Sequence, residues 1–238
     1  MKRAILDELL AARRNKKPVA LVTILASGNQ VVVYPDTDPA TGVKTTSAAR
    51  DALHTDRSGV IETEHGTAFI HVFVPPRRMF IIGAVHIAQV LAPMAALAGY
   101  EVTVIDPRRA FATETRFPSV SVIKEWPDRA LERLVPDNRT AIVALTHDTK
   151  LDEPALKMAL QSDTFYIGAL GSKKTQAARR ERLAKNGFSE QALSRIRGPA
   201  GLDIGAKTPG EIAISIMAEL TQILRQQNTV SEHKQGNA

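Results

Sequence analysis

The feature that most constrains the fold is the stretch from Met79 to Asp106. Four apolar residues lead into Gly83, a helix-compatible segment follows to Gly99, and a second β-branched run ends at Asp106. This order of strand, tight turn, helix and strand is typical of a dinucleotide-binding βαβ unit. Asp106 also follows Gly83 by about the 20 residues expected of an acid that binds ribose. The stretch therefore predicts a Rossmann-like parallel sheet.

One position departs from the glycine fingerprint G-x-G-x-x-G/A. Val85 stands where the second glycine would let the backbone approach a pyrophosphate. Gly83 still provides the turn, and Ala88 still permits close packing of the helix on the strand. The sequence therefore supports the fold and disfavours tight binding of NAD(P).

The composition, 44% hydrophobic and 24% charged, is that of a soluble globular protein. No segment approaches the roughly 18 uninterrupted apolar residues of a membrane-spanning helix, and the N-terminal residues do not resemble a signal peptide. We therefore expect a cytoplasmic protein without a membrane partner. The chain has no cysteine, which excludes disulfides, thiolate metal ligands and a cysteine nucleophile. The histidines show no metal-ligand spacing, so we expect no metal site.

The positive charge is concentrated between Ala169 and Arg197. Eight basic and two acidic residues in this segment account for the whole formal net charge of +6. Such a segment suits an anionic small molecule, nucleic acid or an acidic protein surface, or is an ordinary solvated helix face. Nucleic acid is less favoured, because no readout motif and few aromatic residues accompany the cations.

The chain divides into two blocks at Pro75 and Pro76. Residues 1–76 combine helical and alternating patterns, which predict a small α+β domain with an antiparallel sheet. Its predicted elements are a helix at 3–14, strands at 19–25 and 30–34, a helix at 47–54, and strands at 59–64 and 67–74 around a turn at His65 and Gly66.

Residues 77–228 alternate between strand and helix patterns, which predicts the Rossmann-like α/β domain, and residues 229–238 read as a flexible polar tail. Pro93 should kink or shorten its helix, and Thr208, Pro209 and Glu211 form a capping box for the last helix. The predicted strands are 79–83, 101–106, 120–123, 140–145 and 164–168, and the predicted helices are 86–98, 128–134, 153–161, 173–185, 189–195 and 209–227.

Two candidate site segments follow the first two strands of this domain, at the carboxyl ends where open α/β sheets bind ligands. The first is the turn from Gly83 through Ala84 to His86. The second begins at Asp106, whose carboxylate favours a free ribose hydroxyl, whereas the following Arg108 and Arg109 favour a phosphate. An ordinary charged turn after a strand is the alternative for this second segment.

Two further candidate segments follow later strands. His147 and Asp148 are a plausible acid–base or ligand-positioning pair, although Asp148 also suits bonding to the backbone amides of the turn. Near Gly171, the cationic start of a basic helix suits a phosphate or a pterin phosphate. Its contributors are Ser172, which equally suits an ordinary N-cap, Lys173 and Lys174. Asp203, in a glycine-rich loop before the last helix, is either a turn residue or a ligand contact.

Five motifs together resemble the XdhC/CoxI family of xanthine dehydrogenase accessory proteins, over residues 79–225. The motifs are Gly83 to Gln89, Val104 to Arg108, Thr146 to Asp148, Tyr166 to Thr175, and Gly201 to Ala213. The resemblance implies a Rossmann-like domain that binds molybdenum cofactor, protects it during sulfuration and delivers it to a molybdenum hydroxylase client. It also implies a homo-oligomer, commonly a dimer.

Three features depart from the family pattern. Val85 interrupts the usual Gly-Ala-Gly turn, Gln176 stands where a histidine usually follows the Gly-Ser-x-x-Thr text, and residues 1–76 lack the Ser-Ser-Pro-Arg-type text. Without cysteine the chain cannot carry a persulfide, so sulfuration requires a separate cysteine desulfurase.

We interpret the chain as a cofactor-binding chaperone rather than an enzyme. The alternative is an NAD(P)-dependent oxidoreductase that uses the same cleft with His147 as acid–base, which Val85 and the absence of a Tyr-x-x-x-Lys relay oppose. The predicted cofactor-binding residues are Gly83, Ala84, His86, Asp106, Arg108, His147, Asp148, Gly171, Ser172, Lys173, Lys174 and Asp203.

Overall fold

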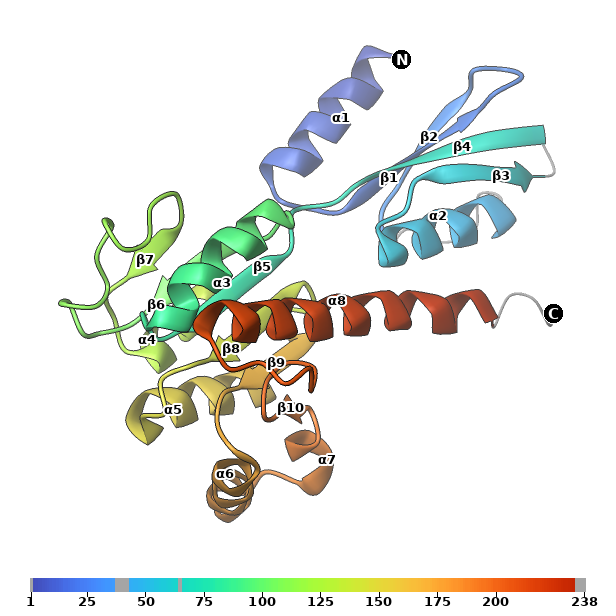
Figure 1. Ribbon diagram of the computed structural model, residues 1–238. Helices are drawn as coiled ribbons and strands as arrows, with labels where there is room; N and C mark the ends of the chain where they lie inside the picture. Colours follow the sequence, from blue (N-terminus) through green and yellow to red (C-terminus); the bar gives the residue numbers. More distant parts are fainter. Residues whose placement is uncertain (1, 37–42, 64–65, 234–238) are drawn as a thin grey trace. The chain divides into compact units, whose positions relative to one another are not determined.

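The computed structural model describes residues 2–36, 43–63 and 66–233 (Figure 1). The chain forms two compact units, one of Met1–Pro75 with Gln227–Ala238 and one of Pro76–Gln226. Each unit has its own sheet and its own hydrophobic core.

The first unit is built on a four-stranded antiparallel sheet with the order β2-β1-β4-β3. Alternate residues of β1 face opposite sides, so Val22 packs with Leu53 of α2 while Leu21 packs with Leu9 of α1. Helix α2 begins earlier than predicted, and His65 of the predicted turn lies outside the described residues. The elements are α1 (Arg3–Arg14), β1 (Val19–Ile24), β2 (Gln30–Val33), α2 (Val43–Thr55), β3 (Gly59–Thr63) and β4 (Gly66–Phe73).

The second unit is built on a six-stranded parallel sheet with the order β10-β9-β8-β5-β6-β7. This order is that of a Rossmann fold, which confirms the predicted fold class. The elements are β5 (Arg78–Ile82), α3 (His86–Leu97), β6 (Glu101–Ile105), β7 (Ser121–Ile123), α4 (Pro127–Leu134), β8 (Thr140–Ala144), α5 (Thr149–Leu160), β9 (Tyr166–Ala169), α6 (Lys173–Lys185), α7 (Glu190–Leu193), β10 (Ile196–Arg197) and α8 (Pro209–His233). The end of α8, from Gln227, is grouped with the first unit.

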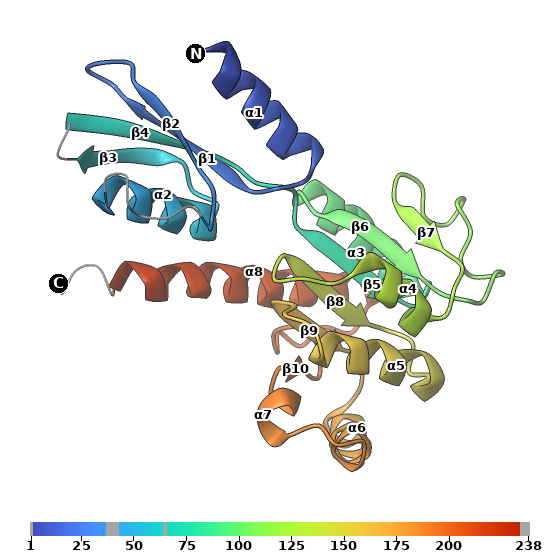
Figure 2. The ribbon, with the colours of Figure 1, turned by 180° about the vertical axis from the view of Figure 1, so that it is seen from behind.

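Helices cover both faces of this sheet (Figures 1 and 2). On one face, Ile81 packs with Leu91 of α3 and Ile216 of α8. On the other face, Phe80 packs with Leu131 of α4 and residues of α5. Successive strand residues point to opposite faces of the sheet, and helices cover both faces. Each central strand therefore reads as an uninterrupted apolar run. Within the described part of the chain, no helix has the length and apolarity needed to cross a membrane.

The switch in strand order lies between β5 and β8. Ile82, the last residue of β5, is paired with Ile105 of β6 on one side and Ala144 of β8 on the other. The residues that follow these three strands therefore emerge side by side at the carboxyl edge, where ligands bind in this fold.

Several predicted boundaries in this unit were wrong. Strand β10 was missed, because two residues are too short for a periodic pattern to show. Helix α5 begins at Thr149 rather than at residue 153, since Asp148 caps it. Helix α3 continues through Pro93 to Leu97, so the proline does not shorten it. Helix α8 extends to His233, past its predicted end at residue 227 and into the predicted tail.

Candidate functional site

The turn after β5 depends on a glycine at position 83. Gly83 has a φ of +105°, and a Cβ added there would lie 2.3 Å from Cγ2 of Thr146. A side chain is therefore excluded by both backbone conformation and space. The contact also shows that the loops after β5 and β8, two separate candidate segments in the sequence, meet at the switch point.

Asp106 is buried and fully hydrogen bonded, whereas we predicted that it would face a ligand. Its Oδ2 accepts from the Ala84 N–H at 2.8 Å and from Nη2 of Arg108 at 2.7 Å, and its Oδ1 accepts from N–H and Nε of Arg108, both at 2.9 Å. Burial raises the pKa of Asp106, but these hydrogen bonds outweigh it and hold the pKa below its ordinary value. The carboxylate therefore fixes the turn. Ala84, also predicted to contact the ligand, has no exposed surface.

Arg116 joins the glycine turn to the loop after β6. Its Nη1 donates to the carbonyl oxygens of Ala84 at 2.9 Å and Phe111 at 2.8 Å, and its Nη2 donates to Oε1 of Gln89 at 3.0 Å. Beside it, the guanidinium carbon of Arg108 lies 4.8 Å from the centroid of the Phe111 ring. We did not identify Arg116 or Phe111 from the sequence, because the loop has no periodic pattern and two isolated aromatic residues were the only available signal.

The N-terminus of α3 lacks a side-chain cap. Its N-cap position is Val85, whereas Asp148 caps α5 and Ser172 caps α6. His86, at the first helical position, is exposed and its Nδ1 lies 3.2 Å from Oε1 of Gln89. Uncapped first-turn amides carry partial positive charge and suit an anion, so this helix end at the switch point has the electrostatics of an anion site.

The loop after β8 presents His147 in a strained conformation. His147 is exposed and has a φ of +61°, which is uncommon for a residue other than glycine. Neighbouring bonds hold it there: Oγ1 of Thr146 accepts from the Asp148 N–H at 3.0 Å and donates to Oδ1 of Asp152 at 2.6 Å. Asp148 accepts from the Lys150 N–H at 2.9 Å, which confirms its alternative role as a turn and cap residue.

A buried ion pair is connected to this loop by the hydrogen bond between Thr146 and Asp152. Asp152 and Arg179 are both almost fully buried, with Oδ2 and Nη2 3.6 Å apart, and Oδ2 accepts no hydrogen bond from the described residues. Burial raises the pKa of Asp152, and contacts with Thr146 and Arg179 only partly offset this. Gln176, which replaces the usual histidine, is buried beside the pair, accepts from Arg179 and donates to the Ala169 carbonyl at 2.8 Å. Position 176 is therefore structural in this chain.

Four of the eight cations of the basic segment are paired with carboxylates, two of which lie in α5. Arg195 donates to three backbone carbonyls. Lys173 and Lys174, in the first turn of α6, are exposed and make no ion pair with other described residues. They are the cations of this segment best placed to meet an anion. The four ion pairs of the segment are Arg179–Asp152, Arg180–Glu190, Arg182–Glu153 and Lys185–Glu181.

The loop that carries Asp203 is anchored by a buried pair. Glu219 of α8 accepts from the hydroxyl of Tyr166 at 2.6 Å and from the Gly201 N–H at 2.9 Å. Burial and the neighbouring carboxylate raise the pKa of Tyr166 well above its ordinary value. Asp203 itself is exposed, so the anchor leaves its carboxylate facing solvent.

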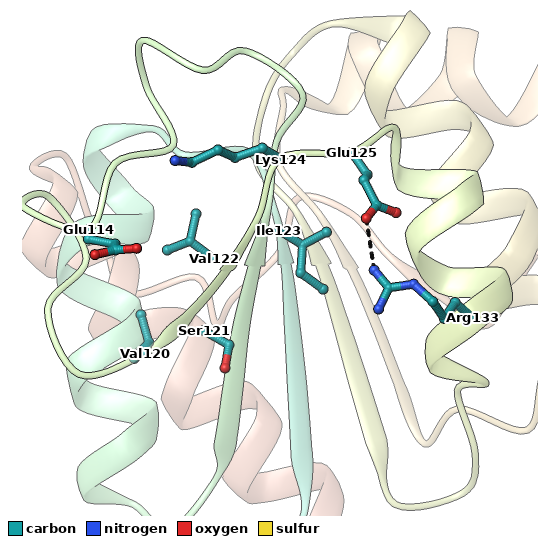
Figure 3. A pocket seen from close by; sticks show the side chains of 8 residues that line it. All are labelled: Glu114, Val120, Ser121, Val122, Ile123, Lys124, Glu125 and Arg133. Atoms are coloured by element: carbon teal, nitrogen blue, oxygen red, sulfur yellow. Dashed lines mark hydrogen bonds and ion pairs between the residues drawn. The ribbon is translucent and has the colours of Figure 1, made fainter.

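A pocket of about 480 Å³ lies along the edge strand β7, lined by Glu114, Val120, Ser121, Val122, Ile123, Lys124, Glu125 and Arg133 (Figure 3). Glu125 and Arg133 form an ion pair at 3.0 Å on one side of it. Strand β6 separates β7 from the switch point, and the pocket contains none of the predicted site residues. Across the described ranges, no group of three metal-ligating side chains occurs.

A family model described as the XdhC Rossmann domain matches residues 79–220. The chain belongs to the XdhC family. Among curated relatives, the uncharacterized protein YqeB of Escherichia coli (strain K12) is 31% identical over 177 residues, covering 73% of this chain and 31% of that protein. A probable xanthine dehydrogenase subunit of Bacillus subtilis (strain 168) is 34% identical, covering 65% of this chain and 45% of that protein.

A third relative of this XdhC-family chain is the molybdenum cofactor insertion chaperone PaoD of Escherichia coli (strain K12). It is 30% identical, and the match covers 63% of this chain and 41% of PaoD. The chain thus spans less than half the length of these relatives. A crystal structure of a xanthine dehydrogenase from Bacillus halodurans superposes with a TM-score of 0.61 over 95% of both chains, at 20% identity. This last likeness supports the fold.

Proposed function

We propose that this chain is an accessory protein that binds molybdenum cofactor and supports its sulfuration and insertion into a molybdenum hydroxylase of the xanthine dehydrogenase type. The relatives named above include a molybdenum cofactor insertion chaperone and a probable xanthine dehydrogenase subunit. In this proposal the chain acts as a homo-oligomer, and a separate cysteine desulfurase supplies sulfur because the chain has no cysteine.

The observation that carries the proposal is the uncapped N-terminus of α3 at the switch point. The cofactor is a pterin that bears an anionic phosphate, and such a group fits amides that lack an internal partner. His86 is exposed in the first turn of this helix and His147 is exposed in the loop after β8, and Lys173 and Lys174 begin α6 at the same edge of the sheet. These residues would hold the cofactor by its charged and polar groups.

The alternative function, an NAD(P)-dependent oxidoreductase, has no comparable structural feature in its favour. A ribose diol requires a free carboxylate after the second strand, and Asp106 is saturated by Ala84 and Arg108. Val85 places a branched side chain where a pyrophosphate would approach. Both observations favour a ligand other than a dinucleotide.

The first test uses the protein purified from cells that make molybdenum cofactor. The released ligand is oxidised and examined for pterin fluorescence, while the protein without ligand is titrated with NAD(P)H. We expect pterin and no NAD(P)H binding. NAD(P)H binding without pterin would overturn the proposal and direct attention to a substrate screen with a His147→Ala control.

A second test addresses the cations of α6. The double substitution Lys173→Ala and Lys174→Ala should weaken retention of pterin, and by more at low salt than at high salt, because exposed charges are screened. The matched control is Lys157→Ala with Lys185→Ala, which removes the same charge from the C-terminal turns of α5 and α6. Equal retention by both double variants would remove Lys173 and Lys174 from the site.

A further inference from the structure

We propose that Phe111 and Arg108 form the subsite that receives the pterin ring of the ligand. This inference rests on the proposed function and assigns one part of the ligand to two residues outside the helix ends that suit its phosphate. Phe111 is 46% exposed, and the Arg108 side chain is 36% exposed. The guanidinium carbon of Arg108 lies 4.8 Å from the ring centroid of Phe111, so two planar groups lie together at the carboxyl end of β6.

The position of Phe111 places it beside the glycine turn. One atom, Nη1 of Arg116, donates both to the carbonyl of Ala84 in that turn and to the carbonyl of Phe111. This nitrogen therefore links the backbone of Phe111 to the glycine turn at the switch point. Arg116 also lies over the Phe117 ring, at 5.6 Å, which fixes the guanidinium that makes this link.

The chemistry presented at this place differs from that of a dinucleotide site. The carboxylate that would bind a ribose is Asp106, and its two oxygens accept four bonds from Ala84 and Arg108. Arg108 is held by its Nε and Nη2, so its position is set before any ligand arrives, and less freedom is lost on binding. What remains open to a ligand is the edge of a guanidinium and a phenyl ring.

These groups recognise a planar heteroaromatic ring. Aromatic rings stack in offset arrangements, and the guanidinium that lies over the Phe111 ring adds a positive charge that favours an anionic ligand. A pterin has both a flat conjugated ring and, in the cofactor, a phosphate. A ligand without an aromatic ring would gain nothing from Phe111, so the subsite would select for the ring rather than for the charge.

The test compares Phe111→Leu, which keeps an apolar side chain but removes the ring, with Phe111→Trp, which keeps a ring. Each full-length variant is purified from cofactor-producing cells and scored for pterin per protein, and is then titrated with pterin-6-carboxylate, whose fluorescence is quenched on stacking. Loss of one stacking contact weakens binding by about tenfold or more. We expect that loss in Phe111→Leu and not in Phe111→Trp.

The matched control is Phe69→Leu, the same substitution at a partly exposed phenylalanine of β4 in the other unit. Thermal melting of each variant checks that the fold is intact. Pterin retained by wild type and by Phe111→Leu to the same extent would overturn the subsite and leave the proposed function standing. Absence of pterin from wild type would overturn the proposed function, and the subsite with it. Equal loss in Phe111→Leu and Phe111→Trp, with normal melting, would also overturn the stacking role.

Discussion

Substituting Asp106 by asparagine tests the claim that this carboxylate holds the glycine turn. The side chains have the same shape, but the carboxylate oxygens each accept two donors, Oδ2 from Ala84 and Arg108 and Oδ1 from two groups of Arg108. An amide offers one oxygen. In either orientation its NH₂ group therefore faces two donors, and two hydrogen bonds are lost.

The expected loss of stability follows from those two bonds. A hydrogen bond to a charged group contributes roughly 1.5–3 kcal/mol, so Asp106→Asn should lower the free energy of unfolding by about 3 kcal/mol at pH 7. With a urea m-value of about 2 kcal/mol per molar, the midpoint of unfolding would fall by about 1.5 M.

The loss should depend on pH in a defined direction. The pKa of Asp106 in the folded chain lies below its ordinary value of 3.8, so the carboxylate stabilises the fold above that value and stops doing so as pH falls through the folded pKa. The difference between wild type and Asp106→Asn should therefore be constant near neutral pH and shrink below pH 3.8.

Urea unfolding followed by tryptophan fluorescence measures this directly. Trp126, the one tryptophan in the sequence, precedes α4 in the same unit as Asp106, so its emission reports on that unit. Asp203→Asn is the matched control, because it makes the same change at an exposed site and should alter stability by less than about 0.5 kcal/mol. A loss below about 1 kcal/mol for Asp106→Asn, or equal losses in both variants, would refute the assigned role.

Two further predictions concern neighbouring contacts. Gly83→Ala should destabilise the chain by about 3 kcal/mol in thermal or urea unfolding, because the added Cβ would clash with Thr146. The control Gly99→Ala adds a Cβ at φ +89° into open space and should destabilise the chain by only about 1 kcal/mol. Equal losses of stability in the two variants would contradict the clash. Arg179→Met leaves Asp152 buried without its cation and should cost about 3 kcal/mol at pH 7. The pKa of Asp152, already raised by burial, would rise further, so this cost should shrink as pH falls through it; a cost independent of pH would refute the pairing.

Local signals in the sequence were sufficient for the fold. The uninterrupted apolar runs predicted the central strands, and the capping box predicted the start of α8, where Glu211 accepts from the N–H groups of Lys207 and Thr208, both at 2.8 Å. Both features depend on residues that are adjacent or nearly adjacent in the sequence. Strand β10 escaped prediction because Ile196 gains its strand character by pairing with Ile167, which is remote in sequence.

The loops that form the candidate site were predictable from the sequence, but the orientation of their side chains was not. The carboxyl ends of strands were located correctly, and the contact of Gly83 with Thr146 brings two predicted segments together. The sequence could not show that Arg108, two residues after Asp106, turns back onto it and covers it. The roles of Arg116 and Phe111 depend on tertiary contacts and produce no periodic pattern in the sequence.

The ion pairs of the basic segment bear on how the protein binds polyanions. Association with a polyanion is driven by the release of condensed counterions, and the number released follows the cations that are free to replace them. Arg180, Arg182 and Lys185 already have carboxylate partners, so each would have to exchange one partner for another. On heparin the protein should therefore elute at lower salt, and with a weaker salt dependence, than its sequence pI of about 9.7 suggests.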